Sequence, residues 1–179
     1  MKTSTEEWKM IEVEITKDML KRAKKRSKAM GIINNSITGG RGNIAGFLGE
    51  EVVNDLINGQ IDDQYDYDII KGDLKIDVKT KRCTSPPKPF YECSIAKTSD
   101  HQRCDLYIFV RIEWHKNKPN EWKTAWILGS MNRDEYFSQA TFLNKGDIDP
   151  SNNFVVKADC FNLKISELNE LDDNLLSQK

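Results

Sequence analysis

The order of apolar patterns along the chain predicts an α/β protein with a mixed central β-sheet flanked by helices. Two segments with helical spacing come early, and several short runs with the alternating or continuous apolar pattern of strands follow them. The chain has 179 residues, of which 38% are hydrophobic and 31% charged, a balance typical of one globular domain with a single core. We therefore expect one domain over residues 1–179.

The first expected elements are a strand, a helix, a loop and a second helix. Residues 11–15 alternate apolar and acidic side chains, which is the period of a half-buried strand. Residues 16–30 place apolar side chains three or four apart, between a capping threonine and a terminating glycine, and predict an amphipathic helix. A glycine-rich loop is expected at 34–42. Residues 43–58 are apolar around most of a helix circumference, so this helix is expected to be buried on more than one side.

A β-hairpin is expected next. Residues 65–70 and 74–81 have the composition of strands, and residues 71–73 form a tight turn between them. Because side chains alternate along a strand, the face of the second strand that carries Ile76 and Val78 is expected to contact the core. The opposite face then carries Asp77, Lys79 and Lys81.

The rest of the chain completes the sheet. Residues 106–110 form a near-continuous apolar run, typical of a strand that is buried on both faces. A stiff proline-rich loop is expected at 86–89. The other expected elements are strands at 91–95, 122–128 and 153–162 and helices at 132–140 and 165–175.

Charge is unevenly distributed along the chain. The net charge is −1, yet residues 17–28 hold seven basic side chains against one acid, which leaves the remainder of the chain at about −7. A local positive face on an acidic body suits contact with a phosphate backbone, although a solvated lysine-rich helix face would have the same composition. The residues expected to contact nucleic acid are Lys21, Lys24, Lys25, Lys28, Arg41 and Lys81.

The cysteines and histidines give weaker signals. Cys83, Cys93, Cys104 and Cys160 have no CxxC pairing, so reduced and mostly buried thiols are expected rather than a zinc site. His101 is interpreted as a structural histidine. The chain has no apolar run of bilayer length and no apolar leader at its start, so we expect a cytoplasmic protein with no membrane partner.

Two carboxylates and a lysine on the hairpin form the candidate catalytic cluster. Asp68 and Asp77 would repel each other if held close, and a divalent cation would remove that penalty. Mg²⁺ is typically held by one or two carboxylates and several waters, and Mn²⁺ is expected to substitute for it. Lys79 lies on the same face as Asp77, where it can orient a water or stabilise charge on a phosphate. A carboxylate on the buried helix, Glu50 or Glu51, is costly unless it is paired or binds a metal.

The segment Asp68-Ile69-Ile70, a turn, and then Ile76-Asp77-Val78-Lys79 resembles the signature of the PD-(D/E)XK nuclease superfamily. The resemblance covers residues 43–81. It implies a restriction-endonuclease-like fold with a catalytic core at about 43–112. It also implies that Asp68, Asp77 and Glu50 are the metal ligands and Lys79 is the catalytic lysine. The chain departs from the pattern in having no proline before Asp68; Asp66 is an alternative first ligand, and Gln102 is a further candidate for the site.

The expected function is therefore metal-dependent hydrolysis of DNA phosphodiester bonds by an endonuclease, of the small type found in phages. The alternative is a non-catalytic nucleic-acid-binding protein on a nuclease scaffold. The patterns leave open whether the substrate is single-stranded, duplex or branched and whether cutting is sequence-specific. A homodimer is one option for the assembly, because cutting both strands of a duplex commonly calls for two active sites.

Overall fold

The computed structural model describes residues 9–30 and 41–176. The predicted glycine loop lies mostly outside these residues, and the second helix begins at Arg41, two residues before the predicted start. Within the described ranges the elements are β1 (Ile11–Glu14), α1 (Lys17–Met30), α2 (Arg41–Ile57), β2 (Gln60–Ile61), β3 (Ile69–Lys71), β4 (Leu74–Cys83), β5 (Glu92–Ala96), η1 (Lys97–Ser99), β6 (Leu106–His115), β7 (Lys118–Asn132), α3 (Arg133–Gln139), β8 (Thr141–Leu143), β9 (Cys160–Lys164), η2 (Ile165–Glu167) and α4 (Asp173–Leu176).

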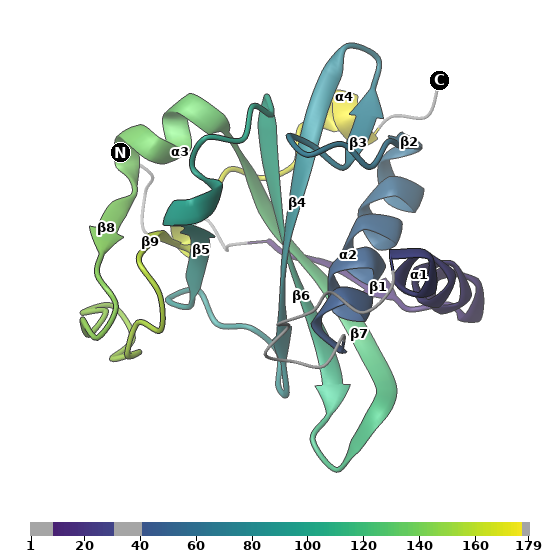
Figure 1. The fold of residues 1–179 in the computed structure, drawn as a ribbon, viewed down its shortest axis with the longest axis horizontal. Coiled ribbons are helices and arrows are strands. Elements are labelled where there is room, and N and C mark those ends of the chain that lie inside the picture. The colour runs from purple at the N-terminus through teal and green to yellow at the C-terminus, as the bar shows by residue number, and fades with distance from the viewer. Residues whose placement is uncertain (1–8, 31–40, 177–179) are drawn as a thin grey trace.

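The predicted α/β class with a mixed sheet is confirmed. A six-stranded sheet has the order β1-β7-β6-β4-β3-β2, in which β4 and β6 are parallel and the other neighbours antiparallel. A separate three-stranded sheet has the order β5-β9-β8. Figure 1 shows α1 and α2 on one side of the large sheet, and the small sheet with α3 on the other. The large sheet is therefore covered by helices on one face and mainly by a second sheet on the other.

The alternating side chains of the central strands feed two cores. Ile76 and Val78 of β4 and Ile108 of β6 pack with the α1–α2 core. Tyr107 and Phe109 of β6 point to the opposite side and pack with the small sheet. This arrangement confirms both the predicted face of β4 and the predicted burial of residues 106–110 on both faces, since a central strand has no solvent-facing side.

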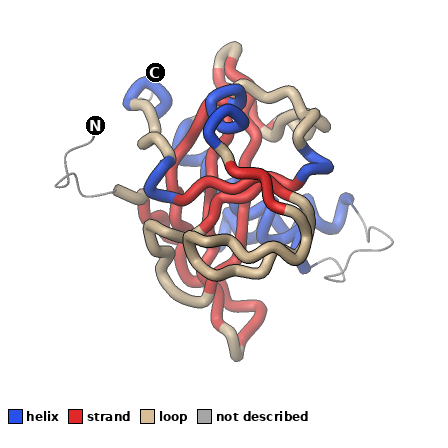
Figure 2. Tube along the Cα trace, turned by 90° about the vertical axis from the view of Figure 1, so that its left-hand side faces the viewer, coloured by secondary structure: helices blue, strands red, loops and turns tan. Residues whose placement is uncertain are grey.

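Three expected elements differ from the structure. The strand expected over 65–70 is reduced to β3, because residues 62–68 form a loop closed by Asp62 N–H donating to the Asp68 carbonyl at 2.8 Å. The strand expected over 153–162 is only β9, which starts at Cys160. Figure 2 shows the loops on the side of the molecule where β8 and β9 lie.

The closing helix expected over 165–175 is replaced by η2, an extended stretch and α4. The leucines of its apolar stripe contact different cores: Leu168 packs with the small sheet, whereas Leu171 and Leu175 pack with α1 and α2. The segment passes from one core to the other, and such a path can match helical spacing without being a helix. None of the helices in the described ranges has the length and apolar character needed to cross a bilayer.

Candidate active site

The predicted carboxylates come together at the junction of α2, β3 and β4. We call Glu50, Asp68, Asp77 and Lys79 the acidic site. Asp77 is on β4 and only 4% exposed, and its Oδ2 lies 2.7 Å from Lys79 Nζ. Both side chains point to the face of β4 that is opposite the α1–α2 core, as their spacing predicts.

Asp68 lies beside β4 because it extends the β3–β4 ladder by one residue. Its backbone N–H donates to the Ile76 carbonyl at 2.9 Å, and its Oδ2 accepts from the Val78 N–H at 2.8 Å. The alternative acid, Asp66, turns away and accepts from the Arg103 N–H at 3.1 Å. The geometry therefore brings Asp68, and not Asp66, to the acidic site.

Glu50 approaches from α2, at a point where helix and strand are in close contact. A Cβ atom on Gly49 would lie 2.0 Å from Thr80 Oγ1, so only glycine lets α2 come this near to β4. The Glu50 carboxyl, 9% exposed, hydrogen-bonds with Asp68 and forms an ion pair with Arg26. The neighbouring Glu51 instead pairs with Arg22 and Arg26, at 2.7 and 3.2 Å. Of the two acids left open by the sequence, Glu50 is the one beside Asp68.

The electrostatics of these carboxyl groups show an excess of negative charge. Burial, followed by the charges of Asp77 and Glu50, raises the pKa of Asp68 to about 8. Burial raises the pKa of Glu50 to about 7 against the opposing effect of Arg26, and burial raises the pKa of Asp77 against that of Lys79. Asp68 lies between two other acids, and no ion pair joins it to a basic side chain among the described residues.

A hard divalent cation fits this donor set. The donors are carboxylate oxygens, which Mg²⁺ prefers, and a bound cation would remove the repulsion that raises the pKa of Asp68. Over residues 9–30 and 41–176, no three His, Cys, Asp or Glu side chains are arranged to hold one ion together. Arg26 and Lys79 instead pair with the two outer acids. One or two carboxylates completed by water is the arrangement that these residues fit.

Gln102 adjoins the acidic site. Its Oε1 accepts from Lys79 Nζ at 3.2 Å, and its Nε2 donates to the Tyr65 carbonyl at 2.7 Å. Arg133 Nε donates to the Gln102 carbonyl at 2.7 Å and fixes this loop. His101 is exposed and pairs with the Tyr65 hydroxyl.

The basic run of α1 divides into two groups. Lys21, Lys24, Lys25 and Lys28 are exposed and, with Lys17 and Leu20, line a shallow hollow of about 530 Å³. Arg22 and Arg26 turn instead toward acids of α2 and the 62–68 loop. Arg22 and Arg26 belong to the same basic run as the lysines, but their spacing follows that of the buried Met19 and Ala23.

Two other predicted nucleic-acid contacts have different outcomes. The side chain of Arg41 lies outside the part of the chain that the structure describes. Lys81 is not on the surface with the α1 lysines: it is half-buried, and its Nζ lies 3.0 Å from both Glu92 Oε1 and Ser94 Oγ. Lys81 stays a predicted nucleic-acid contact, at a position beside Glu92 and Ser94 of β5.

One large cavity and the cysteines lie apart from the carboxylates of the acidic site. A cavity of about 630 Å³ is lined by residues of β3, β4, β7 and the segment before α4, with none of the acidic site. The four cysteines are free thiols, and burial raises the pKa of Cys93 and Cys104 to about 12. A raised thiol pKa disfavours the thiolate that zinc binds.

Comparisons with family models and with curated proteins found no match to this sequence.

Proposed function

We propose that this chain is a Mg²⁺-dependent DNA endonuclease of the restriction-endonuclease-like, PD-(D/E)XK type, with Asp68, Asp77, Glu50 and Lys79 as its active site. The observation that carries the proposal is the position of Asp68, half-buried between Glu50 and Asp77, with its pKa raised to about 8. Groups with strongly shifted pKa values beside specific charged partners concentrate at functional sites. The lysine two residues after Asp77 is what distinguishes this cluster from a simple cation site.

Each residue has a distinct part in hydrolysis. When bound, Mg²⁺ polarises a phosphoryl oxygen and lowers the pKa of a coordinated water. Asp68 and Asp77 would hold the ion, and Glu50 would hold a water in its coordination shell. Lys79, kept in place by Gln102, would donate to the attacking water or to a phosphate oxygen where negative charge develops. The exposed lysines of α1 would contact the DNA backbone.

The test is a cleavage assay on linear, circular, single-stranded and branched DNA with Mg²⁺, with Mn²⁺ and with a chelator. Asp77→Asn and Lys79→Ala are expected to lower the cleavage rate about 100- to 1000-fold, the usual effect of removing one such stabilising group. DNA binding, measured by gel shift in chelator, should remain largely unchanged. Asp73→Asn is the matched control, because Asp73 is an exposed acid in the turn of the same hairpin.

The main alternative is a non-catalytic nucleic-acid-binding protein on the same scaffold. The pairing of Glu50 with Arg26 and of Asp77 with Lys79 favours it, since both outer acids already have cations. A gel shift without cutting for every substrate and metal would support this alternative. Loss of cleavage in proportion to loss of folding in the variants would also count against the enzyme.

A further inference from the structure

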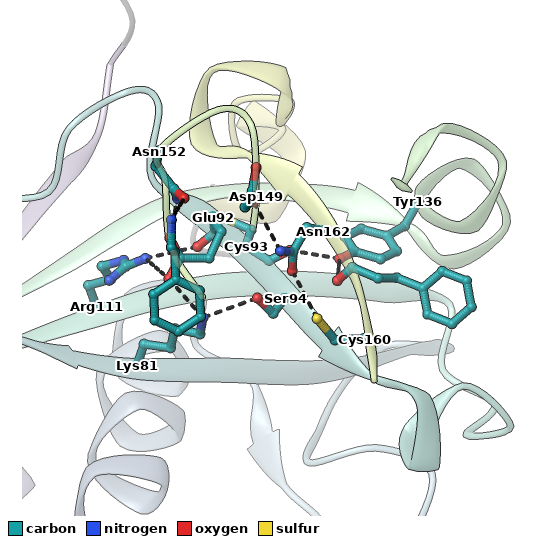
Figure 3. Close-up of polar contacts among 12 residues, drawn as sticks. Lys81, Glu92, Cys93, Ser94, Arg111, Tyr136, Asp149, Asn152, Cys160 and Asn162 are labelled. Atoms are coloured by element: carbon teal, nitrogen blue, oxygen red, sulfur yellow. Dashed lines mark hydrogen bonds and ion pairs between the residues drawn. The ribbon is translucent and has the colours of Figure 1, made fainter. Parts of the chain in front are cut away.

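A second charged cluster lies on the same face of β4 as Asp77 and Lys79, one step further along the strand (Figure 3). The parallel register pairs Lys81 with Arg111 on β6, just as it pairs Lys79 with Phe109. Strand β5 of the small sheet crosses above this point and brings Glu92 and Ser94 to the two cations.

Lys81 and Arg111 together carry more N–H donors than the carboxylate oxygens of Glu92 can pair with. Lys81 Nζ lies 3.0 Å from Glu92 Oε1, and Arg111 Nη2 donates to the Glu92 carbonyl at 2.8 Å and lies 3.4 Å from Oε1. The other carboxylate oxygen, Oε2, accepts from Asn152 Nδ2 at 2.7 Å. Two cations thus share the carboxylate of Glu92.

Arg111 has an unused donor that is almost fully buried. Its side chain is 8% exposed, and its Nε has no hydrogen-bond partner among the described residues. A buried N–H without an acceptor carries the cost of its lost hydration, so such groups in native proteins call for an explanation. A ligand oxygen would supply the missing acceptor.

A small cavity lies at this position. It has a volume of about 110 Å³ and lies between β4 and β6 on one side and β5 on the other, with Lys79, Lys81, Glu92, Ser94 and Arg111 among its lining residues. At about 30 Å³ per water molecule, the cavity has room for three or four waters, or for one group of similar size. Lys79, a residue of the acidic site, is also one of the residues that line this cavity.

We propose that this cavity, the anion pocket, binds a phosphate group of the nucleic acid next to the phosphate at Asp77 and Lys79. The inference rests on the proposed function. Arg111 and Lys81 supply charge and directed N–H donors, and Ser94 supplies a hydroxyl. Lys79 and Lys81 are two residues apart, or about 6.6 Å along a strand. Successive phosphates of one DNA strand advance by about 3.4 Å along the duplex axis and by more when the strand is extended, so neighbouring phosphates can reach both positions.

The test measures binding in chelator, so that it does not depend on cleavage. Affinities are compared for one short single-stranded oligonucleotide with a 5′-phosphate, with a 3′-phosphate and with neither, and for inorganic phosphate. Phosphorylation at one end is expected to tighten binding about tenfold, and Ser94→Ala and Lys81→Met should each reduce that preference. Lys116→Met, which removes an exposed charge from the β6–β7 turn, should preserve it.

A direct readout follows the Arg111 side chain itself. Addition of the phosphorylated oligonucleotide should shift the Nε–Hε NMR resonance of Arg111, whereas the unphosphorylated one should not. Thermal melts of each variant establish that it is folded; Arg111→Lys, which keeps the charge but removes Nε, is the conservative variant and should lose the preference.

The outcomes separate the two proposals. No phosphate preference in a protein that cleaves DNA overturns the anion pocket and leaves the nuclease intact. A phosphate preference in a protein that never cleaves supports the pocket and overturns the nuclease. Binding of inorganic phosphate with no preference among the oligonucleotides overturns the assignment of the pocket to nucleic acid.

Discussion

Two buried charged clusters lie along one face of β4, and they differ in the balance of their charges. At Asp77 the acids outnumber the cations, and burial with neighbouring acids raises the pKa of Asp68 to about 8. At Lys81 the cations outnumber the acid: burial opposes ionisation of Glu92, but Lys81 and Arg111 outweigh it and lower the pKa of Glu92. Burial raises the pKa of both carboxyl groups, and the neighbouring charges reinforce that effect at Asp68 and reverse it at Glu92.

The comparison shows what each cluster lacks. The acidic site lacks positive charge and is suited to a cation, whereas the Lys81–Arg111 cluster lacks an acceptor and is suited to an anion. A phosphodiester with its metal ion supplies both. The variants below test this contrast, in order of decreasing expected effect.

The largest effect is expected within the acidic site. Asp68→Asn should lower the cleavage rate about 1000-fold because it removes a proposed metal ligand and keeps the side chain's shape. Asp66→Asn, two residues earlier, should stay within a few-fold of the parent, since Asp66 bonds to the Arg103 N–H instead. Initial rates are measured at saturating Mg²⁺. Equal losses in the two variants would mean that Asp66 belongs to the acidic site as much as Asp68 does.

The two clusters should respond with opposite sign when an acid is neutralised. Glu92→Gln leaves Lys81 and Arg111 without a countercharge and should lower the free energy of unfolding by about 3 kcal/mol. Asp68→Asn removes a repelled charge and should raise it by about 1 kcal/mol at pH 8 without metal. Urea denaturation in chelator measures both values, and a stabilising Glu92→Gln would contradict the contrast.

The stability of the metal-free protein should depend on pH through the acidic site. The pKa values of Asp68 and Glu50 are raised in the folded state, to about 8 and about 7, so the folded protein binds more protons than the unfolded chain. Without metal, their contribution to stability should therefore fall as the pH rises from about 4 to about 8. Asp68→Asn should flatten this slope.

Magnesium should act most strongly where that contribution is lost. Metal binding requires the ionised carboxylates, so the rise in melting temperature on adding Mg²⁺ should be larger at pH 8 than at pH 5. The same comparison in Asp73→Asn serves as the control and should match the parent. A metal effect independent of pH would contradict binding at these acids.

The smallest effect is expected at the exposed lysines of α1. Lys24→Gln combined with Lys28→Gln should reduce the slope of log affinity against log salt by about 1.8 for duplex DNA, or about 0.9 per lost phosphate contact. The control is Lys116→Gln with Lys157→Gln, two exposed lysines elsewhere on the molecule. Equal changes in both pairs would show that the α1 lysines contribute only to overall charge.

Much of the acidic site followed from local patterns. The face shared by Asp77 and Lys79 is fixed by the two-residue period of a strand, and it was predicted correctly. The preference for Asp68 over Asp66 depended on the apolar pair after Asp68, and the ladder bonds of Asp68 agree with it. Burial of the helix did not separate Glu50 from Glu51; only the family resemblance selected Glu50, and the structure has Glu50 beside Asp68.

Secondary structure was predicted wrongly, and side-chain contacts were not predicted, where the residues of one apolar stripe or one basic run contact different parts of the fold. Leu168 and Leu175 have helical spacing but contact different cores. The contacts of Lys81 with Glu92 and Ser94 were not predicted, because no local spacing indicates that β5 lies beside this part of β4. Arg111 was not predicted as a site residue, because it lies within an apolar strand.

The sequence by itself determined the α/β class, the hairpin turn and the alternation that puts an acid and a lysine on one face, because these depend on residues close together in the chain. Only the tertiary structure decided which acid of the helix lies beside them and which arginines form ion pairs. It also decided that β5 covers Lys81 and Arg111. Such pairings depend on the burial and charge of partners far along the chain, and no local spacing encodes them.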